Sequence, residues 1–208
     1  PDVVPQEAPI PPTLDWEAWL GGAEDRPFSP AYAPHNWRAF PDFGCGAVGD
    51  MACHILGTPN MAMRLTAPTS VECIKLEGKA KYTFPYRTAL RWDFPARGAM
   101  PPVKVFWYDR MEAVPKFEGV PEGELIGDKD INGSLFIGDK GMVTTGCYGE
   151  NTRLVPAERM KDYKMPPQML SRAPGPAKEW VRGHYRDWIR ACKGGEPACS
   201  NFSVSGPF

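Results

Sequence analysis

An acid and an imidazole stand four residues apart at Asp50 and His54. If a helix follows the glycines that precede them, the two side chains lie on one helix face, one turn apart. An imidazole transfers protons near neutral pH, and a carboxylate one turn away can hold a substrate hydroxyl. The pair therefore suits the deprotonation of a sugar or polyol hydroxyl while hydride leaves the same carbon. An alternative stays open, in which Asp50 caps the helix and His54 is a buried structural histidine.

The glycines in front of this pair, Gly44, Gly46 and Gly49, spell the G-x-G-x-x-G pattern of a dinucleotide-binding fold. That pattern needs a buried strand before the first glycine. Residues 33–43 instead contain two prolines and no β-branched residue, which predicts a loop. We therefore favour the interpretation that the glycines form the entry of a catalytic helix, where a missing Cβ allows another segment to approach closely.

A second polar cluster consists of His35, Asn36, Trp37 and Arg38. Sugar hydroxyls bind to forked donors and acceptors, and the face of an indole packs against sugar C–H groups. These four residues are therefore candidates for substrate binding, although a loop anchored by Trp37 would give the same pattern. His184 is a further candidate for substrate binding, but a lone helix histidine needs partners to form a site.

The six cysteines are scattered and include no C-x-x-C pair. A zinc site would need at least one closely spaced pair of ligands, so the sequence predicts no metal site. A disulfide framework is not expected at this length and spacing either. We expect most of the thiols to be small buried side chains.

Charge and hydropathy exclude several classes of partner. The 208 residues contain 24 Lys and Arg against 25 Asp and Glu, a formal net charge of −1. This balance lacks the basic footprint of a nucleic-acid-binding protein. No apolar run approaches the thickness of a bilayer, so no membrane span is predicted. The chain starts without Met and stops without an evident closing element, which indicates a piece of a longer protein and leaves a cytoplasmic or a periplasmic location open.

The elements that must position the candidate residues are short and separated by proline-rich loops. Residues 1–44 should form a long loop with one or two helical turns after Asp15, pinned by Trp16, Trp19 and Trp37. A helix is expected from Asp50 to about residue 65, with a break near residues 57–59.

Alternating apolar residues predict strands in the middle of the chain, and an amphipathic helix follows over residues 177–193. The expected strands cover residues 71–76, 90–94, 103–107, 134–137, 142–145 and 152–155, with a hairpin turn at residues 138–141. Strands in the middle with helices on either side predict an α+β fold. We expect a two-layer domain with a large, mostly antiparallel, open-faced sheet covered by helices on one face.

In order and spacing, these motifs resemble the C-terminal domain of the glucose-fructose oxidoreductase / inositol dehydrogenase / MocA-like (Gfo/Idh/MocA) family. The resemblance spans nearly the whole chain. It is carried by residues 14–21, Asn36-Trp37-Arg38, residues 42–51 with His54, the hairpin at residues 135–141 and the helix at residues 184–189.

The resemblance implies that residues 1–208 are the C-terminal substrate-binding and oligomerisation domain of a two-domain oxidoreductase. The N-terminal Rossmann domain, which binds most of the NAD or NADP, would be absent, so this fragment alone should be inactive. By the same match, Asp50 positions the substrate and faces the nicotinamide, which makes it a cofactor contact as well. His54 takes the hydroxyl proton, and the open sheet face forms a homo-oligomer.

The expected substrate is a sugar, an inositol or a related hydroxyl compound. Two alternatives to a net oxidation remain. One is an NAD-assisted glycoside-cleaving enzyme of the same family, in which oxidation acidifies a neighbouring C–H group. The other is a non-catalytic sugar-binding or assembly module that keeps the fold but has lost the chemistry.

Overall fold

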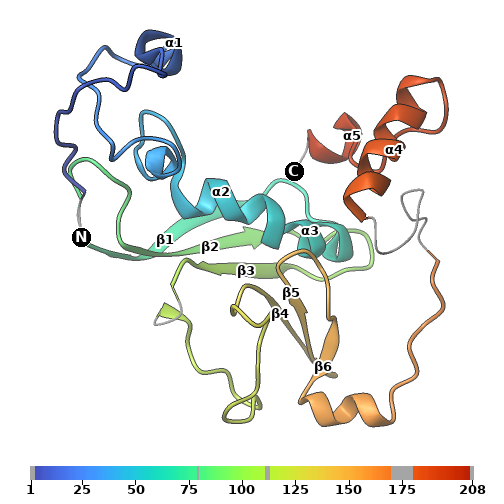
Figure 1. Cartoon of the computed structure of the whole chain (residues 1–208). Coiled ribbons are helices and arrows are strands. Elements are labelled where there is room, and N and C mark those ends of the chain that lie inside the picture. The colour runs from blue at the N-terminus through green and yellow to red at the C-terminus, as the bar shows by residue number, and fades with distance from the viewer. Residues whose placement is uncertain (1–2, 79, 111–112, 170–179, 207–208) are drawn as a thin grey trace. The chain divides into compact units, whose positions relative to one another are not determined.

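The computed structural model describes residues 3–78, 80–110, 113–169 and 180–206. The chain divides into two compact units, Pro1–Glu158 and Arg159–Phe208. Each unit is described by itself below. The described residues form a mixed α+β structure, as the sequence predicted (Figure 1).

The first unit begins with an aromatic cluster around α1 (Trp16–Leu20). Asp15 caps this helix, since its carboxylate accepts a 3.0 Å hydrogen bond from the backbone N–H of Ala18. Trp16 and Leu20 are buried and form a small core. The helical turn expected after Asp15 is confirmed. The other buried members of this core are Phe28, Tyr32 and Phe40.

Two consecutive helices follow a short 3-10 helix, η1 (Asn36–Ala39). α2 runs over Gly46–Ile55 and α3 over Gly57–Met63. The predicted break is confirmed, because the chain leaves α2 at residue 56 and starts α3 directly after it. The predicted start at Asp50 was too late by four residues, because Gly46 and Gly49 lie within α2 and not in a loop before it.

The described strands form two antiparallel three-stranded sheets instead of the one large sheet that the sequence predicted. Each predicted strand is present, but the pairing joins only strands that follow one another along the chain. Alternation of apolar residues predicts a strand and its two faces, whereas it carries no information about which distant strands pair. The first sheet contains β1 (Ser70–Glu77), β2 (Arg87–Phe94) and β3 (Val103–Tyr108), and the second contains β4 (Gly133–Gly138), β5 (Gly141–Gly146) and β6 (Arg153–Val155).

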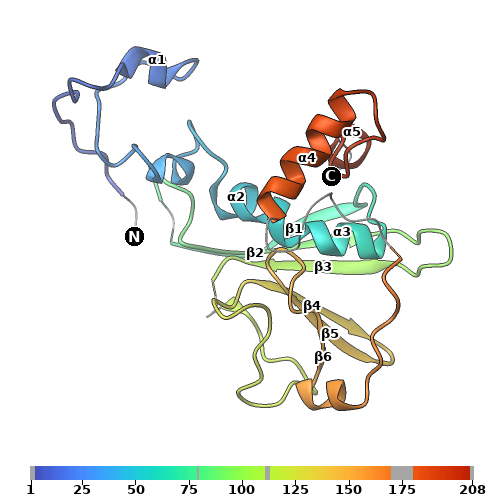
Figure 2. The same ribbon diagram turned by 45° about the vertical axis from the view of Figure 1, so that its right-hand side comes forward.

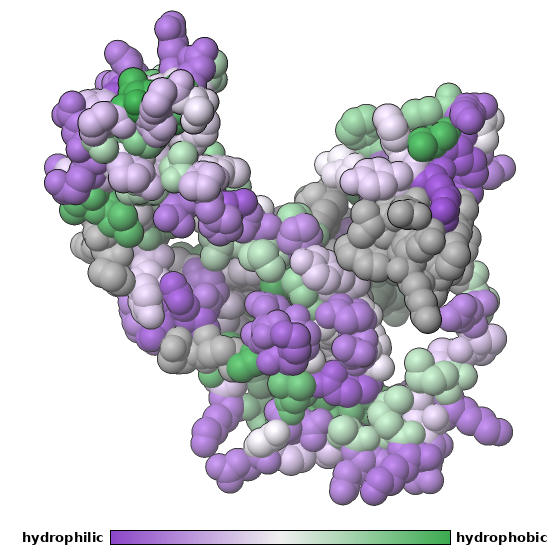
Figure 3. Space-filling model, in the orientation of Figure 1, coloured by the Kyte–Doolittle hydropathy of each residue, from purple (hydrophilic) through white to green (hydrophobic). Residues whose placement is uncertain are grey.

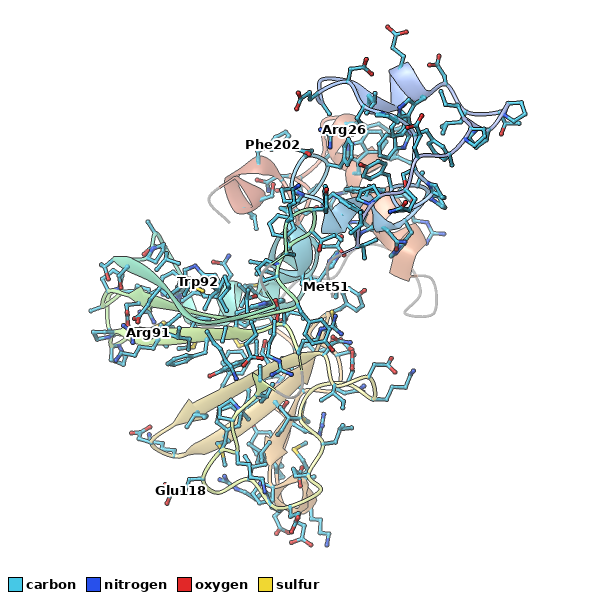
Figure 4. The ribbon with its side chains drawn as sticks, turned by 90° about the vertical axis from the view of Figure 1, so that its left-hand side faces the viewer. Arg26, Met51, Arg91, Trp92, Glu118 and Phe202 are labelled. Atoms are coloured by element: carbon cyan, nitrogen blue, oxygen red, sulfur yellow. The ribbon has the colours of Figure 1, made fainter. Side chains whose placement is uncertain are left out.

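The faces of the first sheet follow the alternation of its side chains. Arg91 and Trp92, neighbours on β2, lie on opposite faces (Figure 4). Arg91 forms ion pairs with Glu72 at 2.9 Å and with Asp93 at 3.1 Å, so one face carries a ladder of charges. β1 is an edge strand, and nearly all of it is exposed. In the view of Figure 3, hydrophilic residues cover much of the visible surface of the first unit.

α2 and α3 lie along one side of the β1–β3 sheet (Figures 1 and 2). The last carbonyl groups of both helices accept hydrogen bonds from the segments that contain the strands, one from a strand and one from the β2–β3 connection. The hydroxyl of Ser134 on β4 donates to the carbonyl of Ile55 at 3.2 Å, and Arg97 Nε donates to the carbonyl of Met63 at 2.9 Å. These bonds fix the C-terminal ends of α2 and α3 relative to the sheets.

The second unit contains α4 (Trp180–Cys192) and the short helix α5 (Phe202–Ser205). α4 confirms the predicted final helix, whose first residues, 177–179, lie outside the described residues, as does the side chain of Val181. Tyr185 and Trp188 of the expected apolar stripe are exposed in this unit. α5 was not predicted, because four residues carry no periodic pattern. A further 3-10 helix, η3 (Ala157–Lys161), spans the boundary between the units.

The prediction that most cysteines are buried was wrong. Cys147 is buried, whereas the other five free cysteines are exposed. Cys73 shows the reason, because it lies on the edge strand β1, which has no strand on its outer side. The exposure of Cys73 therefore follows from its position in the sheet, which the residue type does not reveal. None of the helices that the structure describes is both long and apolar enough to cross a membrane.

Candidate functional site

Asp50 and His54 both lie within α2, with one helical turn between them. Asp50 is half-buried, and the residue at the N-cap is Cys45, whose side chain makes no capping hydrogen bond. His54 is exposed. The alternative of a helix cap and a buried structural histidine is therefore wrong, and both polar side chains reach the surface of the first unit.

Arg38 joins the two candidate clusters of the sequence. Its Nε donates a 3.1 Å hydrogen bond to Oδ1 of Asp50, with the two side chains 30% and 39% exposed. The guanidinium carbon lies 4.6 Å from the centre of the Trp37 ring, a cation–π contact. A second nitrogen of Arg38 donates to the backbone carbonyl of His35. Arg38 thus connects the loop cluster to Asp50, one member of the helix pair.

Gly44 allows this arrangement because it has no side chain. A Cβ at this position would lie 2.5 Å from Cα of Arg38 and 2.7 Å from its carbonyl oxygen. The backbone N–H of Gly44 also donates to the carbonyl of Phe40 at 2.8 Å, which turns the chain back toward η1. Any larger residue would separate η1 from the start of α2.

Gly46 brings the start of α2 against another segment. Its φ is +64°, and a Cβ there would lie 2.9 Å from Cγ of Phe84. Residues 33–43 form turns and η1 and no strand, so the strand that a dinucleotide fold needs is missing in this part of the chain. The glycines therefore serve the packing of the helix entry, as predicted, and do not form a phosphate cradle.

Tyr148 belongs to the same region and was missed in the sequence. Its ring lies 5.4 Å from the imidazole of His54, centre to centre, with the planes at 68°. It lies in the turn between β5 and β6, where its backbone N–H donates to a carboxylate oxygen of Glu150 at 2.8 Å. In the sequence, Tyr148 stands in a Gly-Cys-Tyr-Gly turn after a predicted strand. This pattern does not indicate which helix the tyrosine contacts.

Cys147, beside Tyr148, is not a candidate nucleophile. Burial raises the pKa of its thiol, and the nearby carboxylates of Asp128 and Glu150 raise it further. A thiol reacts as its thiolate, so Cys147 stays protonated and unreactive near neutral pH.

The other candidate residues divide into two groups. His35 and Asn36 are exposed at the start of η1, beside Arg38. His184 lies on α4 in the second unit, where its ring is 6.2 Å from that of Tyr185. The structure thus brings the predicted loop to Asp50 through Arg38, whereas His184 belongs to the other unit. Among the described residues, no group of three or more His, Cys, Asp and Glu side chains could hold a metal ion.

Comparison with known proteins shows a family similarity for the first part of the chain. No curated protein matches the sequence. Residues 3–77 match the family model described as "Oxidoreductase family, C-terminal alpha/beta domain". The match includes Arg38, Asp50 and His54, and its family is one of NAD(P)-dependent oxidoreductases. It supports the resemblance stated above over residues 3–77, which are similar to the C-terminal domain of the Gfo/Idh/MocA oxidoreductase family.

Proposed function

We propose that this chain is the substrate-binding and catalytic half of an NAD(P)-dependent oxidoreductase that acts on a sugar, an inositol or a related hydroxyl compound. The observation that supports the proposal is the Arg38–Asp50 pair, one helical turn from the exposed imidazole of His54. A carboxylate held by a guanidinium and a neighbouring imidazole form a constellation that can bind two hydroxyl groups and remove a proton from one of them.

In this proposal His54 is the general base. Its imidazole accepts the proton of the hydroxyl group whose carbon is oxidised. Asp50 accepts a hydrogen bond from an adjacent hydroxyl and so orients the reacting carbon. Arg38 binds one oxygen of Asp50 and leaves the other for the substrate. The rings of Trp37 and Tyr148 flank these polar groups and would pack against sugar C–H groups.

The described residues do not fit the phosphates of the cofactor. The positions where a Cβ would stand at Gly44 and Gly46 are already occupied by Arg38 and Phe84, so these glycines leave no open cradle for a pyrophosphate. We propose that a separate domain binds the dinucleotide and that Asp50 contributes at most a contact to the nicotinamide end. The bound cofactor would supply the hydride acceptor, and this chain would supply the proton acceptor and the substrate contacts.

We further propose that the chain forms a homo-oligomer through the β1–β3 sheet. Val71, Ile74 and Leu76 on the edge strand β1 are exposed, as is Phe106 on β3. Exposed apolar residues on an edge strand favour pairing with another chain. Light scattering on the natural protein and on Leu76→Glu tests this point, because the acidic side chain would lower the measured mass to that of a monomer.

The catalytic proposal is tested on the natural protein that contains this chain. The reduction of NAD or NADP is followed by absorbance while glucose, other sugars and myo-inositol are offered in turn. We expect one class of compound to reduce the cofactor and His54→Ala to lower kcat by roughly two to four orders of magnitude.

His35→Ala is the matched control, since it removes an exposed imidazole that is proposed to bind substrate and not to take a proton. It should raise KM while leaving kcat nearly unchanged. An unchanged kcat in His54→Ala would overturn the assignment of the base. Release of a free sugar without net reduction of NAD(P) would show glycoside cleavage in place of oxidation. Failure to bind any nucleotide would point to a non-catalytic module.

A further inference from the structure

An open groove of about 500 Å³ lies beside the candidate site in the first unit. Its walls include the side chains of Trp19, Trp37, Phe43 and Asp42. This volume falls within the roughly 300–1,000 Å³ that small-molecule sites occupy. The proposed roles of Asp50 and His54 do not use it.

The aromatic wall of the groove is held in place by the core around α1. Trp19 stacks on the buried Trp16 at 4.8 Å with nearly parallel rings, and Phe43 meets Trp19 edge to face at 4.9 Å. Trp19 and Trp37 are themselves only half-buried. Rigid and partly exposed indoles bind a ligand at a low cost in side-chain entropy.

The charged groups at the groove are Asp42, which lines it, and Arg26, the ion-pair partner of Asp42. Arg26 donates a 2.6 Å hydrogen bond to Oδ2 of Asp42, and its guanidinium lies 5.1 Å from the centre of the Phe43 ring. Arg26 is labelled in Figure 4 at the edge of this aromatic segment. The side chain of Asp42 remains 56% exposed, so a carboxylate oxygen can accept from a ligand hydroxyl. Indole faces with a carboxylate and a guanidinium at the rim suit a polyhydroxylated ring better than a lipid or an acidic ligand.

Trp37 connects the groove to the candidate site. This residue lines the groove, its ring contacts the guanidinium of Arg38, and Arg38 binds Asp50. A ligand that fills the groove would therefore lie next to a ring bound at Asp50 and His54.

We infer that the groove is a subsite for a second sugar ring, and that the substrate is a glycoside or oligosaccharide of at least two rings. The inference rests on the proposed function, because it takes the ring at Asp50 to be a sugar. The ring in the groove stacks on Trp19, and its hydroxyls donate to Asp42 and accept from Arg26.

Calorimetric titration of the natural protein tests the subsite. The single-ring probes are methyl β-D-glucopyranoside and myo-inositol, and the two-ring probes are cellobiose, maltose and lactose. We expect at least one two-ring probe to bind about tenfold more tightly than the single-ring probes, the gain of one stacked ring with its hydrogen bonds.

Two variants test whether this gain in affinity arises in the groove. Trp19→Leu should reduce the two-ring advantage to about threefold or less, and Asp42→Asn should reduce it by roughly threefold. Tyr86→Leu is the matched control, because it removes an exposed aromatic ring that does not line the groove, and it should keep the full advantage. Circular dichroism verifies that Trp19→Leu remains folded. If that variant unfolds, the affinity of Asp42→Asn for the two-ring probes tests the subsite in its place.

The outcomes separate this inference from the proposed function. If a sugar reduces NAD(P) but the two-ring advantage is absent, or survives Trp19→Leu and Asp42→Asn, the subsite is overturned and the oxidoreductase stands. If two-ring probes bind in a manner that depends on Trp19 but no probe reduces NAD(P), the groove is a sugar site and the oxidoreductase proposal falls. If no probe binds, the subsite is overturned as well.

Discussion

Arg38 lies between Trp37 and Asp50: its guanidinium carbon is 4.6 Å from the centre of the indole, and its Nε is 3.1 Å from the carboxylate. The aromatic ring limits the orientation of the guanidinium, and the guanidinium limits the orientation of the carboxylate. Asp50 is thus oriented by a residue twelve positions earlier in the chain. In the proposed enzyme, this orientation determines which hydroxyl of the substrate reaches His54.

The contribution of Arg38 can be measured by removing its whole side chain or only its planar guanidinium group. Arg38→Ala should lower kcat/KM by about 10- to 100-fold, because Asp50 loses the bond that orients it. Arg38→Lys should recover only part of this loss, since an ammonium keeps the charge but not the flat guanidinium over Trp37. Steady-state kinetics on both variants test this. Full activity of Arg38→Ala would show that Asp50 needs no orientation.

Tyr148 should affect substrate binding more than the chemical step. Tyr148→Leu removes the ring that meets His54 edge to face and should raise KM by roughly three- to tenfold with little change in kcat. Tyr148→Phe keeps the ring and should behave like the unmodified protein. The comparison of KM and kcat in the two variants is the measurement. If Phe and Leu had equal effects, the hydroxyl group and not the ring would be responsible.

The entry of α2 should tolerate no side chain at Gly46. Gly46→Ala places a Cβ on a residue with φ of +64° and brings it to 2.9 Å from the Phe84 ring. We expect the free energy of unfolding to fall by about 1–3 kcal/mol. Gly57→Ala is the control, because a Cβ there meets nothing within 4 Å and its backbone is helical, so it should be neutral or stabilising by up to about 1 kcal/mol. Urea titration of both variants distinguishes them.

A buried carboxylate should make the second unit sensitive to acid. Asp187 accepts 2.7 Å hydrogen bonds from the backbone N–H of Cys199 and from Arg190. The backbone bond first, and then the thiol of Cys199 and the charge of Arg190, lower the pKa of Asp187 below its usual range. A depressed pKa stabilises the folded state above the unfolded pKa of about 3.9. This contribution is therefore lost as the pH falls below that value and through the folded pKa.

Hydrogen exchange at the amide of Cys199 measures this effect. Near pH 6, Asp187→Asn should reduce the protection of this amide by about tenfold, because the amide loses its charged acceptor. At a pH below the folded pKa of Asp187, the variant and the unmodified protein should exchange alike. Asp162→Asn changes an exposed carboxylate in the same unit and should alter nothing. Equal protection in Asp187→Asn near pH 6 would contradict the prediction.

The sequence by itself determined the local structure of this protein. Asp15 before an apolar turn and Gly21 after it define α1, and alternating residues define each strand and its two faces. The four-residue spacing of Asp50 and His54 likewise placed them one turn apart on a helix. These features depend on residues close together in the chain, so a local pattern is enough to predict them.

Only the tertiary structure decided which distant groups meet. It selected Arg38 as the partner of Asp50, brought Tyr148 from the β5–β6 turn to His54, and divided the strands into two sheets. No periodicity in the sequence encodes these contacts, because each depends on how closely separate segments can pack. Gly44 shows the physical reason. The backbone of Arg38 lies where a Cβ of residue 44 would stand, so the absence of that atom matters only after the fold has brought the two segments together.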